Sequence, residues 1–111
     1  MTNAILILVV KMNVNVETVI DNKLTKYDDL VWYARKTAED RANNADCNTE
    51  CLRIETTYPN ECIRLNDPDA ADWEHGFNSG MLAALRYVAS YLTNDPVEIE
   101  FAERSFPYLD A

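Results

Sequence analysis

The chain has 111 residues, a hydrophobic fraction of 48% and a formal net charge of −9, from 19 acidic against 10 basic side chains. A chain of this length forms one domain, and it is close to the size at which a partner subunit often completes the core. The acidic balance, without clustered Lys or Arg, argues against nucleic acid or an anionic membrane as partner. Two Gly and four Pro are too few for the turns of an all-β fold. We therefore expect a mainly α fold, a helical bundle of three to four helices that spans residues 1–111 as a single domain.

The N-terminal segment is aliphatic and rich in β-branched residues. Residues 5–10 read ILILVV, and residues 12–16 alternate apolar with polar side chains. Both patterns favour a short β-strand within residues 4–16, which would pack on the helices or pair with its copy in a second subunit. The alternative is one helix that begins near Thr2 and runs through the whole segment. The apolar run is too short to cross a bilayer and no basic residue precedes it, so we expect a soluble, cytoplasmic protein.

A helix is expected to open at Thr25, after a turn around residues 21–23, because Thr25 and Asp28 have the spacing of a capping box. Its apolar stripe thins toward alanine and consists of Tyr27, Leu30, Val31, Ala34, Ala38, Ala42 and Ala45. Trp32 and Tyr33 lie off this stripe. They either pack on another element or form an exposed aromatic patch of the kind that marks an interface.

A shorter helix is predicted over residues 46–57, where four apolar positions share one face: Cys47, Cys51, Ile54 and Tyr58. Pro59 should end this helix. Residues 61–66 are then expected to form a connector that touches the core through Cys62, Ile63 and Leu65.

The longest helical pattern covers residues 67–92. Asp67 suits the N-cap, with Pro68 at the first helical position. The predicted buried arc consists of Trp73, Phe77, Met81, Ala84, Leu85, Val88 and Leu92, and the opposite face of His75, Ser79, Arg86 and Ser90. Gly76 and Gly80 each cost about 1 kcal/mol in a helix interior. We expect the close approach of a second helix, or of a ligand, to offset that cost.

The C-terminal segment repeats the pattern of a cap followed by proline at Asp95 and Pro96, which predicts a short last helix. The tail that follows contains Phe106 and Tyr108 and is too apolar for a solvated terminus. It should fold back on the core or dock on a neighbouring molecule.

Two sets of residues have the composition of metal ligands. Zinc is commonly held by four thiolate or imidazole groups, and the chain offers Cys47, Cys51, Cys62 and His75. Magnesium prefers carboxylate oxygens, and carboxylates recur at three-residue spacing in Asp69, Asp72, Glu100 and Glu103. The first set lacks the C-x-x-C of a zinc knuckle, and the acidic residues of the second also suit helix N-termini. We expect neither site to be occupied and no cofactor to bind.

Residues 72–86 read DWEHGFNSGMLAALR and residues 106–110 read FPYLD. These two segments resemble parts of small uncharacterised proteins of bacteriophages and large algal viruses. The resemblance covers about a third of the chain. It implies a phage or viral origin, and hence the cytoplasm of a host cell, and it carries no activity with it.

The sequence therefore favours a small acidic accessory protein that acts through protein–protein contacts and self-associates as a homodimer. The predicted interaction surface consists of Trp32, Tyr33, Gly76, Gly80, Phe106 and Tyr108. The alternative is an all-α, metal-dependent nucleotide pyrophosphohydrolase, which would require the four carboxylates of the magnesium set to meet in one cleft.

Overall fold

The computed structural model describes residues 2–93 and 95–105. Its helices are α1 (Thr2–Ala34), α2 (Ala38–Asn43), α3 (Ala45–Thr57), α4 (Pro59–Leu65), α5 (Ala71–Thr93) and α6 (Pro96–Ser105). The prediction of an all-α fold is confirmed, since the described ranges contain no strand. They do contain more helices than the three to four predicted, because the expected connectors are themselves short helices.

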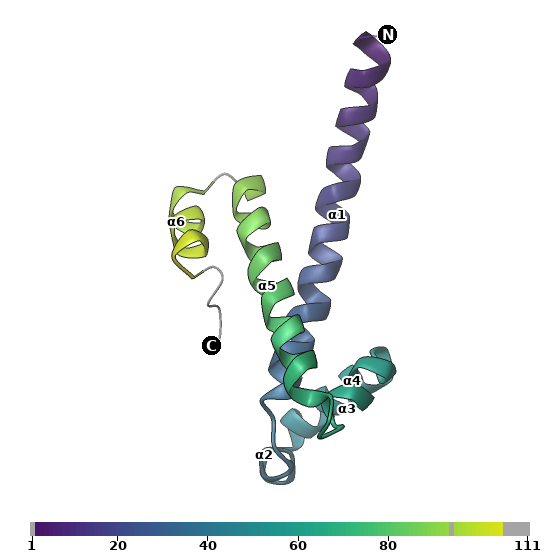
Figure 1. Ribbon diagram of the computed structural model, residues 1–111, viewed down its shortest axis with the longest axis vertical. Helices are drawn as coiled ribbons and strands as arrows, with labels where there is room; N and C mark the ends of the chain where they lie inside the picture. Colours follow the sequence, from purple (N-terminus) through teal and green to yellow (C-terminus); the bar gives the residue numbers. More distant parts are fainter. Residues whose placement is uncertain (1, 94, 106–111) are drawn as a thin grey trace.

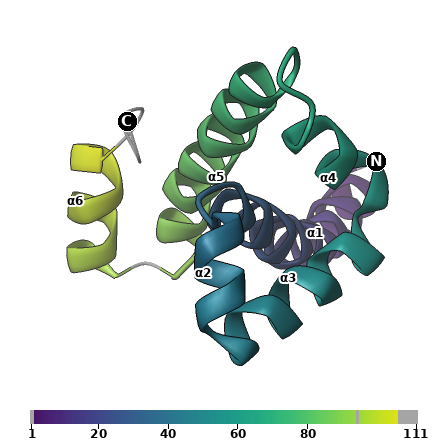
Figure 2. The same cartoon turned by 90° about the horizontal axis from the view of Figure 1, so that it is seen from below.

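Helices α1 and α5 lie side by side and antiparallel, and they form the long axis of the molecule (Figure 1). Helices α3 and α4 pack around the C-terminal end of α1, whereas α6 packs on α5 (Figure 2). The N-terminal part of α1 extends beyond the end of α5 (Figure 1). The radius of gyration is 17.2 Å, against about 13 Å for a compact domain of this length. The chain is therefore elongated.

Residues 5–16 lie in α1, so the predicted N-terminal strand is wrong and the alternative of a helix from Thr2 is correct. Each β-branched residue lowers helix stability by only a few tenths of a kcal/mol, and no Gly or Pro interrupts residues 2–34. The predicted turn before Thr25 is also absent from the described helix. Thr25 Oγ1 instead donates a hydrogen bond to the carbonyl of Asp21, at 3.1 Å, within the continuous α1.

The core lies where α1, α3, α4 and α5 meet. Its buried members are Tyr27, Leu30, Val31, Tyr33, Cys51, Ile54, Cys62 and Leu82. The predicted stripe is confirmed for the three members that belong to α1 and this cluster, and the predicted face of α3 is confirmed at Cys51 and Ile54. Ala38 and Ala42 are exposed on α2, because α1 ends at Ala34 and the stripe does not continue in one helix.

The short helices begin at side-chain caps. Thr37 and Asp40 form a reciprocal capping box at the start of α2, with N–O distances of 3.1 and 2.9 Å. Asn44 caps α3 by accepting the amide of Cys47. Pro59 ends α3 as predicted but also opens α4, as expected for proline at a first helical position.

Helix α4 replaces the predicted connector over residues 61–66. Cys62 is buried and Leu65 packs against the core, as predicted. Ile63 is 68% exposed, so its predicted core contact is wrong. A helical turn places Ile63 about 100° from Cys62 around the axis, and thus away from the core.

Helix α5 begins at Ala71 rather than beside Asp67. The carboxylate of Asp67 accepts the amide of Asp69, and its carbonyl accepts that of Ala71. The Asp67 side chain therefore closes a local turn that precedes the helix. The predicted cap of the last helix is confirmed, because Asp95 Oδ1 accepts the amide of Val97 at 2.9 Å. None of the helices in the described ranges has the length and hydropathy needed to span a membrane.

Candidate functional site

Helix α5 buries a face that mixes polar and apolar side chains. Glu74 is 7% exposed and Asn78 is 1% exposed, and Leu82 continues the same row toward the C-terminus. The buried carboxylate of Glu74 accepts Arg64 Nε at 2.7 Å, and this ion pair offsets its desolvation. Asn78 Nδ2 has no hydrogen-bond partner among the described residues. Met81 and Leu85 complete the packing against the core cluster.

Large apolar side chains of α5 are partly exposed instead, with the Phe77 ring edge-to-face against Tyr27 at 6.4 Å and the Arg64 guanidinium 5.8 Å from the Trp73 ring centroid. Trp73 is 64% exposed, and Phe77 and Val88 are each 45% exposed. The prediction that these residues, together with Leu92, form the buried arc is therefore wrong. The helix is turned so that Glu74, Asn78 and Leu82 face the core, and Arg64 of α4 pairs with Glu74 there.

Six residues on this outer side are separated alternately by four and by three positions in the sequence, which is the spacing of the contact face of a coiled coil. We name them the α5 stripe: Trp73, Phe77, Gly80, Ala84, Tyr87 and Tyr91. Trp73 and Phe77 stack with ring centroids 5.4 Å apart. Tyr87 and Tyr91 form an edge-to-face pair at 5.3 Å. The α5 stripe therefore carries an aromatic pair at each end and two small residues in the middle.

The two glycines of α5 are open on their outer side. A Cβ atom built on Gly76 or Gly80 meets no atom of the described structure within 4 Å. The close helix approach predicted at these glycines is thus not made by another part of the described chain. Neither glycine is therefore required by a close contact within the described chain, although each is costly in a helix interior.

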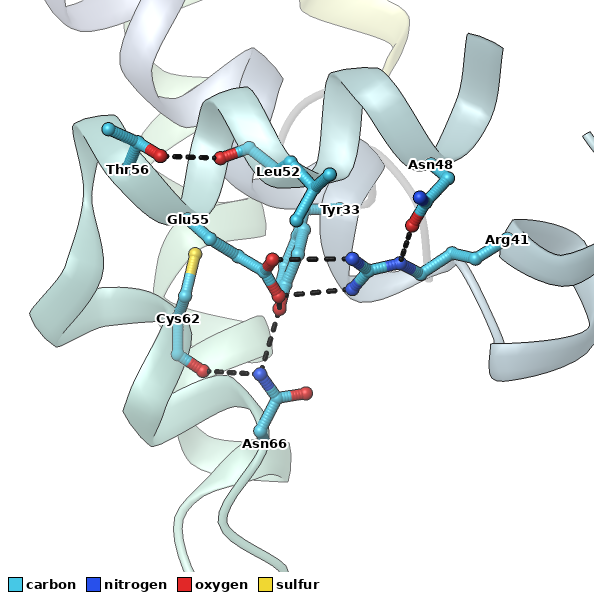
Figure 3. Close-up of polar contacts among 8 residues, drawn as sticks. All are labelled: Tyr33, Arg41, Asn48, Leu52, Glu55, Thr56, Cys62 and Asn66. Atoms are coloured by element: carbon cyan, nitrogen blue, oxygen red, sulfur yellow. Dashed lines mark hydrogen bonds and ion pairs between the residues drawn. The ribbon is translucent and has the colours of Figure 1, made fainter. Parts of the chain in front are cut away.

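A second candidate is a polar cluster at the C-terminal end of α1 (Figure 3). Tyr33 Oη donates to Glu55 Oε2 at 2.7 Å and accepts Asn66 Nδ2 at 2.8 Å. Arg41 makes a two-pronged ion pair with Glu55, at 3.0 and 3.3 Å, and its Nε donates to Asn48. These contacts join α1, α2, α3 and the end of α4.

The electrostatics of this cluster follow from its hydrogen bonds. Burial, with the hydrogen bond to Glu55, raises the pKa of Tyr33 to about 12. The hydrogen bonds from Arg41 and Tyr33 lower the pKa of Glu55. A cavity of about 350 Å³ adjoins the cluster, lined among others by Tyr33, Lys36, Arg41 and Asn66. Because Tyr33 and Arg41 both bind Glu55, we interpret the cluster as a structural link between helix ends.

Of the predicted aromatic patch, only Trp32 keeps an accessible face. Tyr33 is 5% exposed and serves the polar cluster, so it forms no surface. Trp32 is half-buried against the core, with Lys36 Nζ 5.0 Å from its ring centroid. Phe106 and Tyr108 lie outside the described residues.

The predicted zinc ligands do not assemble. Within residues 2–93 and 95–105, no group of three or more His, Cys, Asp or Glu side chains is placed to hold a metal ion. Cys51 and Cys62 are buried, and burial raises the pKa of both thiols, that of Cys62 to about 11. They therefore behave as small core side chains. His75 lies on α5, and its buried Nδ1 has no partner in the described structure.

The predicted magnesium ligands lie at opposite ends of α5. Asp69 and Asp72 are exposed where α5 begins. Glu100 and Glu103 belong to α6, which follows the other end of the 23-residue helix. There Glu100 pairs with Arg104, and Glu103 accepts Tyr91 Oη. The four carboxylates thus do not meet in one cleft, which the pyrophosphohydrolase hypothesis requires.

Comparison of the chain with protein-family models, with curated proteins and with solved structures finds no match. The resemblance to phage and algal-virus proteins therefore stays a prediction. The fold and the site define a class of protein: an elongated all-α protein that carries the partly exposed α5 stripe on its second long helix.

Proposed function

We propose that this protein is a small interaction module that self-associates, and that the α5 stripe is its working surface. The observation that carries the proposal is the exposure of Trp73, at 64%, next to the stacked Phe77. Aromatic residues are enriched at the centre of protein interfaces. A contiguous apolar face of this kind on a monomer marks a binding surface.

The charge distribution supports an apolar contact. The chain carries a net charge of −9, yet the α5 stripe contains no ionisable side chain other than its two tyrosines. Interface centres are depleted of charged residues in the same way. The apolar residues 5–10 of α1 also belong to the part of that helix that extends beyond α5 (Figure 1).

Sedimentation equilibrium of the wild-type chain and of the double variant Trp73→Ser/Phe77→Ser tests the proposal. The wild type should show a mass above the 12.7 kDa of one chain, and the double variant should return to that mass at the same concentration. Leu52→Ser is the matched control, since Leu52 is 51% exposed on α3, outside the stripe. The proposal would be refuted if the double variant still self-associates, or if the wild type is monomeric.

A further inference from the structure

We infer that the occupant of the α5 stripe is the same stripe of a second copy, laid antiparallel across a two-fold axis beside Leu82. This inference rests on the proposed function and specifies the partner and its direction. In this arrangement Gly80 of one copy lies opposite Ala84 of the other, and the reverse contact is made by symmetry.

The size pattern of the stripe is the first reason for a second copy. Read from either end, the α5 stripe runs from an aromatic pair through two small residues to another aromatic pair: Trp73, Phe77, Gly80, Ala84, Tyr87, Tyr91. A two-fold contact requires a surface that is complementary to itself. An antiparallel pairing centred beside Leu82 sets Trp73 against the second copy's Tyr91, and Phe77 against its Tyr87.

The small residues explain how the two helices could approach. At the midpoint of the pair, Gly80 and Ala84 present little or no side chain, and the space over Gly80 is open. Small residues at a crossing point let two helix backbones come close. The aromatic pairs at the two ends of each stripe then close over the partner helix. The intermolecular contact would thereby offset the free energy that Gly80 costs the helix.

The exposed area is the second reason. The chain exposes 7930 Å², whereas a monomer of 12.7 kDa is expected to expose about 6,200 Å². The excess of roughly 1,700 Å² is about twice the 800 Å² that one partner contributes to a standard interface. The excess accompanies the elongated shape, in which α1 extends beyond α5, and a dimer contact along α5 would remove part of it.

Helix α6 leaves this contact accessible. It packs on α5, and Glu103 accepts the hydroxyl of Tyr91. Tyr91 nevertheless remains 48% exposed, so its ring still presents a face beside Tyr87. Val88, 45% exposed, borders the same side.

Disulfide trapping distinguishes the direction of the pairing. Two chains are prepared in a Cys47→Ser background, one with Gly80→Cys and one with Ala84→Cys, and one of them carries a mass tag. The buried Cys51 and Cys62 are retained. On mild oxidation of the mixture, the antiparallel arrangement predicts that the mixed disulfide exceeds either homodisulfide at least about tenfold. A chain with Ala42→Cys, an exposed position on α2, measures random collision.

The outcomes separate this inference from the proposed function. Homodisulfides in place of the mixed product indicate a parallel pairing and overturn the inference. A yield no higher than that of Ala42→Cys overturns it as well. In both cases the proposed function stands if sedimentation still shows association that depends on Trp73 and Phe77. A chain that stays single in sedimentation overturns both.

Discussion

Trp73 and Asn78 lie little more than one turn apart on α5, yet Trp73 is 64% exposed and Asn78 is 1% exposed. The aromatic side chain faces solvent while the amide is enclosed and leaves Nδ2 without a partner in the described structure. Burying an unpaired amide and exposing an indole both cost free energy. A second copy over the α5 stripe would remove the second of these costs.

The two faces of α5 should respond differently to truncation. Leu82→Ala removes a side chain that is 2% exposed, so the free energy of unfolding should fall by about 2–5 kcal/mol. Val88→Ala, at a 45% exposed position, should cost less than about 1 kcal/mol in dilute protein. Urea denaturation measures both. A larger loss for Val88→Ala than for Leu82→Ala would show that the helix is turned the other way.

Substitution of Gly80 should separate folding from association. Because a Cβ atom there meets nothing in the described chain, Gly80→Ala should raise the stability of the single chain by about 1 kcal/mol. Gly80→Leu should leave the single chain folded and weaken association at least about tenfold, or about 1.4 kcal/mol. Circular dichroism and sedimentation measure the two effects.

Ala42→Leu is the control for side-chain size, since Ala42 is exposed on α2. It should change neither the helix content nor the association. If Gly80→Leu associates as tightly as Ala42→Leu does, the crossing does not lie at Gly80.

Salt should strengthen self-association. Two chains that each carry a net charge of −9 repel one another, and added salt screens this repulsion. The dimer dissociation constant should therefore fall as ionic strength rises from low to physiological values. Weaker association at higher salt would instead indicate a contact built on opposite charges, in conflict with the uncharged α5 stripe.

The polar cluster should lose its stabilising effect on the fold in strong base. Burial raises the pKa of Tyr33 from 10.0 to about 12. A group whose pKa is raised on folding contributes stability below its unfolded pKa and loses it as pH rises through the folded value. The stabilisation from Tyr33 should thus be full below about pH 10 and disappear toward pH 12. Tyr33→Phe should lower stability at neutral pH by about 1–2 kcal/mol and should remove one tyrosine that titrates late by ultraviolet absorbance.

In acid, the same cluster should lose stabilising free energy as the pH falls. The hydrogen bonds from Arg41 and Tyr33 lower the pKa of Glu55 below its ordinary 4.5. A carboxyl group with a depressed folded pKa contributes stability above its unfolded pKa, and this is lost as pH falls through the folded value. Glu55→Gln should therefore destabilise the protein at neutral pH and flatten the loss of stability below about pH 4.5. An acid limb that is unchanged by the substitution would contradict the role of this carboxylate.

Local signals in the sequence predict much of the fold. The face of α3 at Cys51 and Ile54 and the cap at Asp95 follow from periodicity and hydrogen-bond chemistry over a few residues. The sequence of the N-terminal segment is ambiguous, because an aliphatic β-branched run is compatible with either strand or helix. It continues without Gly or Pro into the packed half of α1, and the cost of its β-branched residues in a helix is small.

The candidate site depends on a choice between two faces of one helix. The coiled-coil spacing of the α5 stripe is present in the sequence, yet the apolar periodicity assigns three of its residues, Trp73, Phe77 and Ala84, to the core. The side that is buried is decided by tertiary contacts, which include the packing of Leu82 in the core and the Arg64–Glu74 ion pair. The hydrogen-bond partners of Tyr33 come from α3 and from the end of α4, so no sequence spacing reveals that cluster either.

The most direct measurement is the fluorescence of Trp73 during dilution, in a chain where Trp32→Phe leaves it as the single tryptophan. If a second copy covers the α5 stripe, the emission of Trp73 will be that of a buried indole in concentrated protein. It will shift to longer wavelength on dilution, over the range in which sedimentation shows dissociation. Emission of a solvent-exposed indole at every concentration would contradict the account, because it would mean that no second copy covers the stripe.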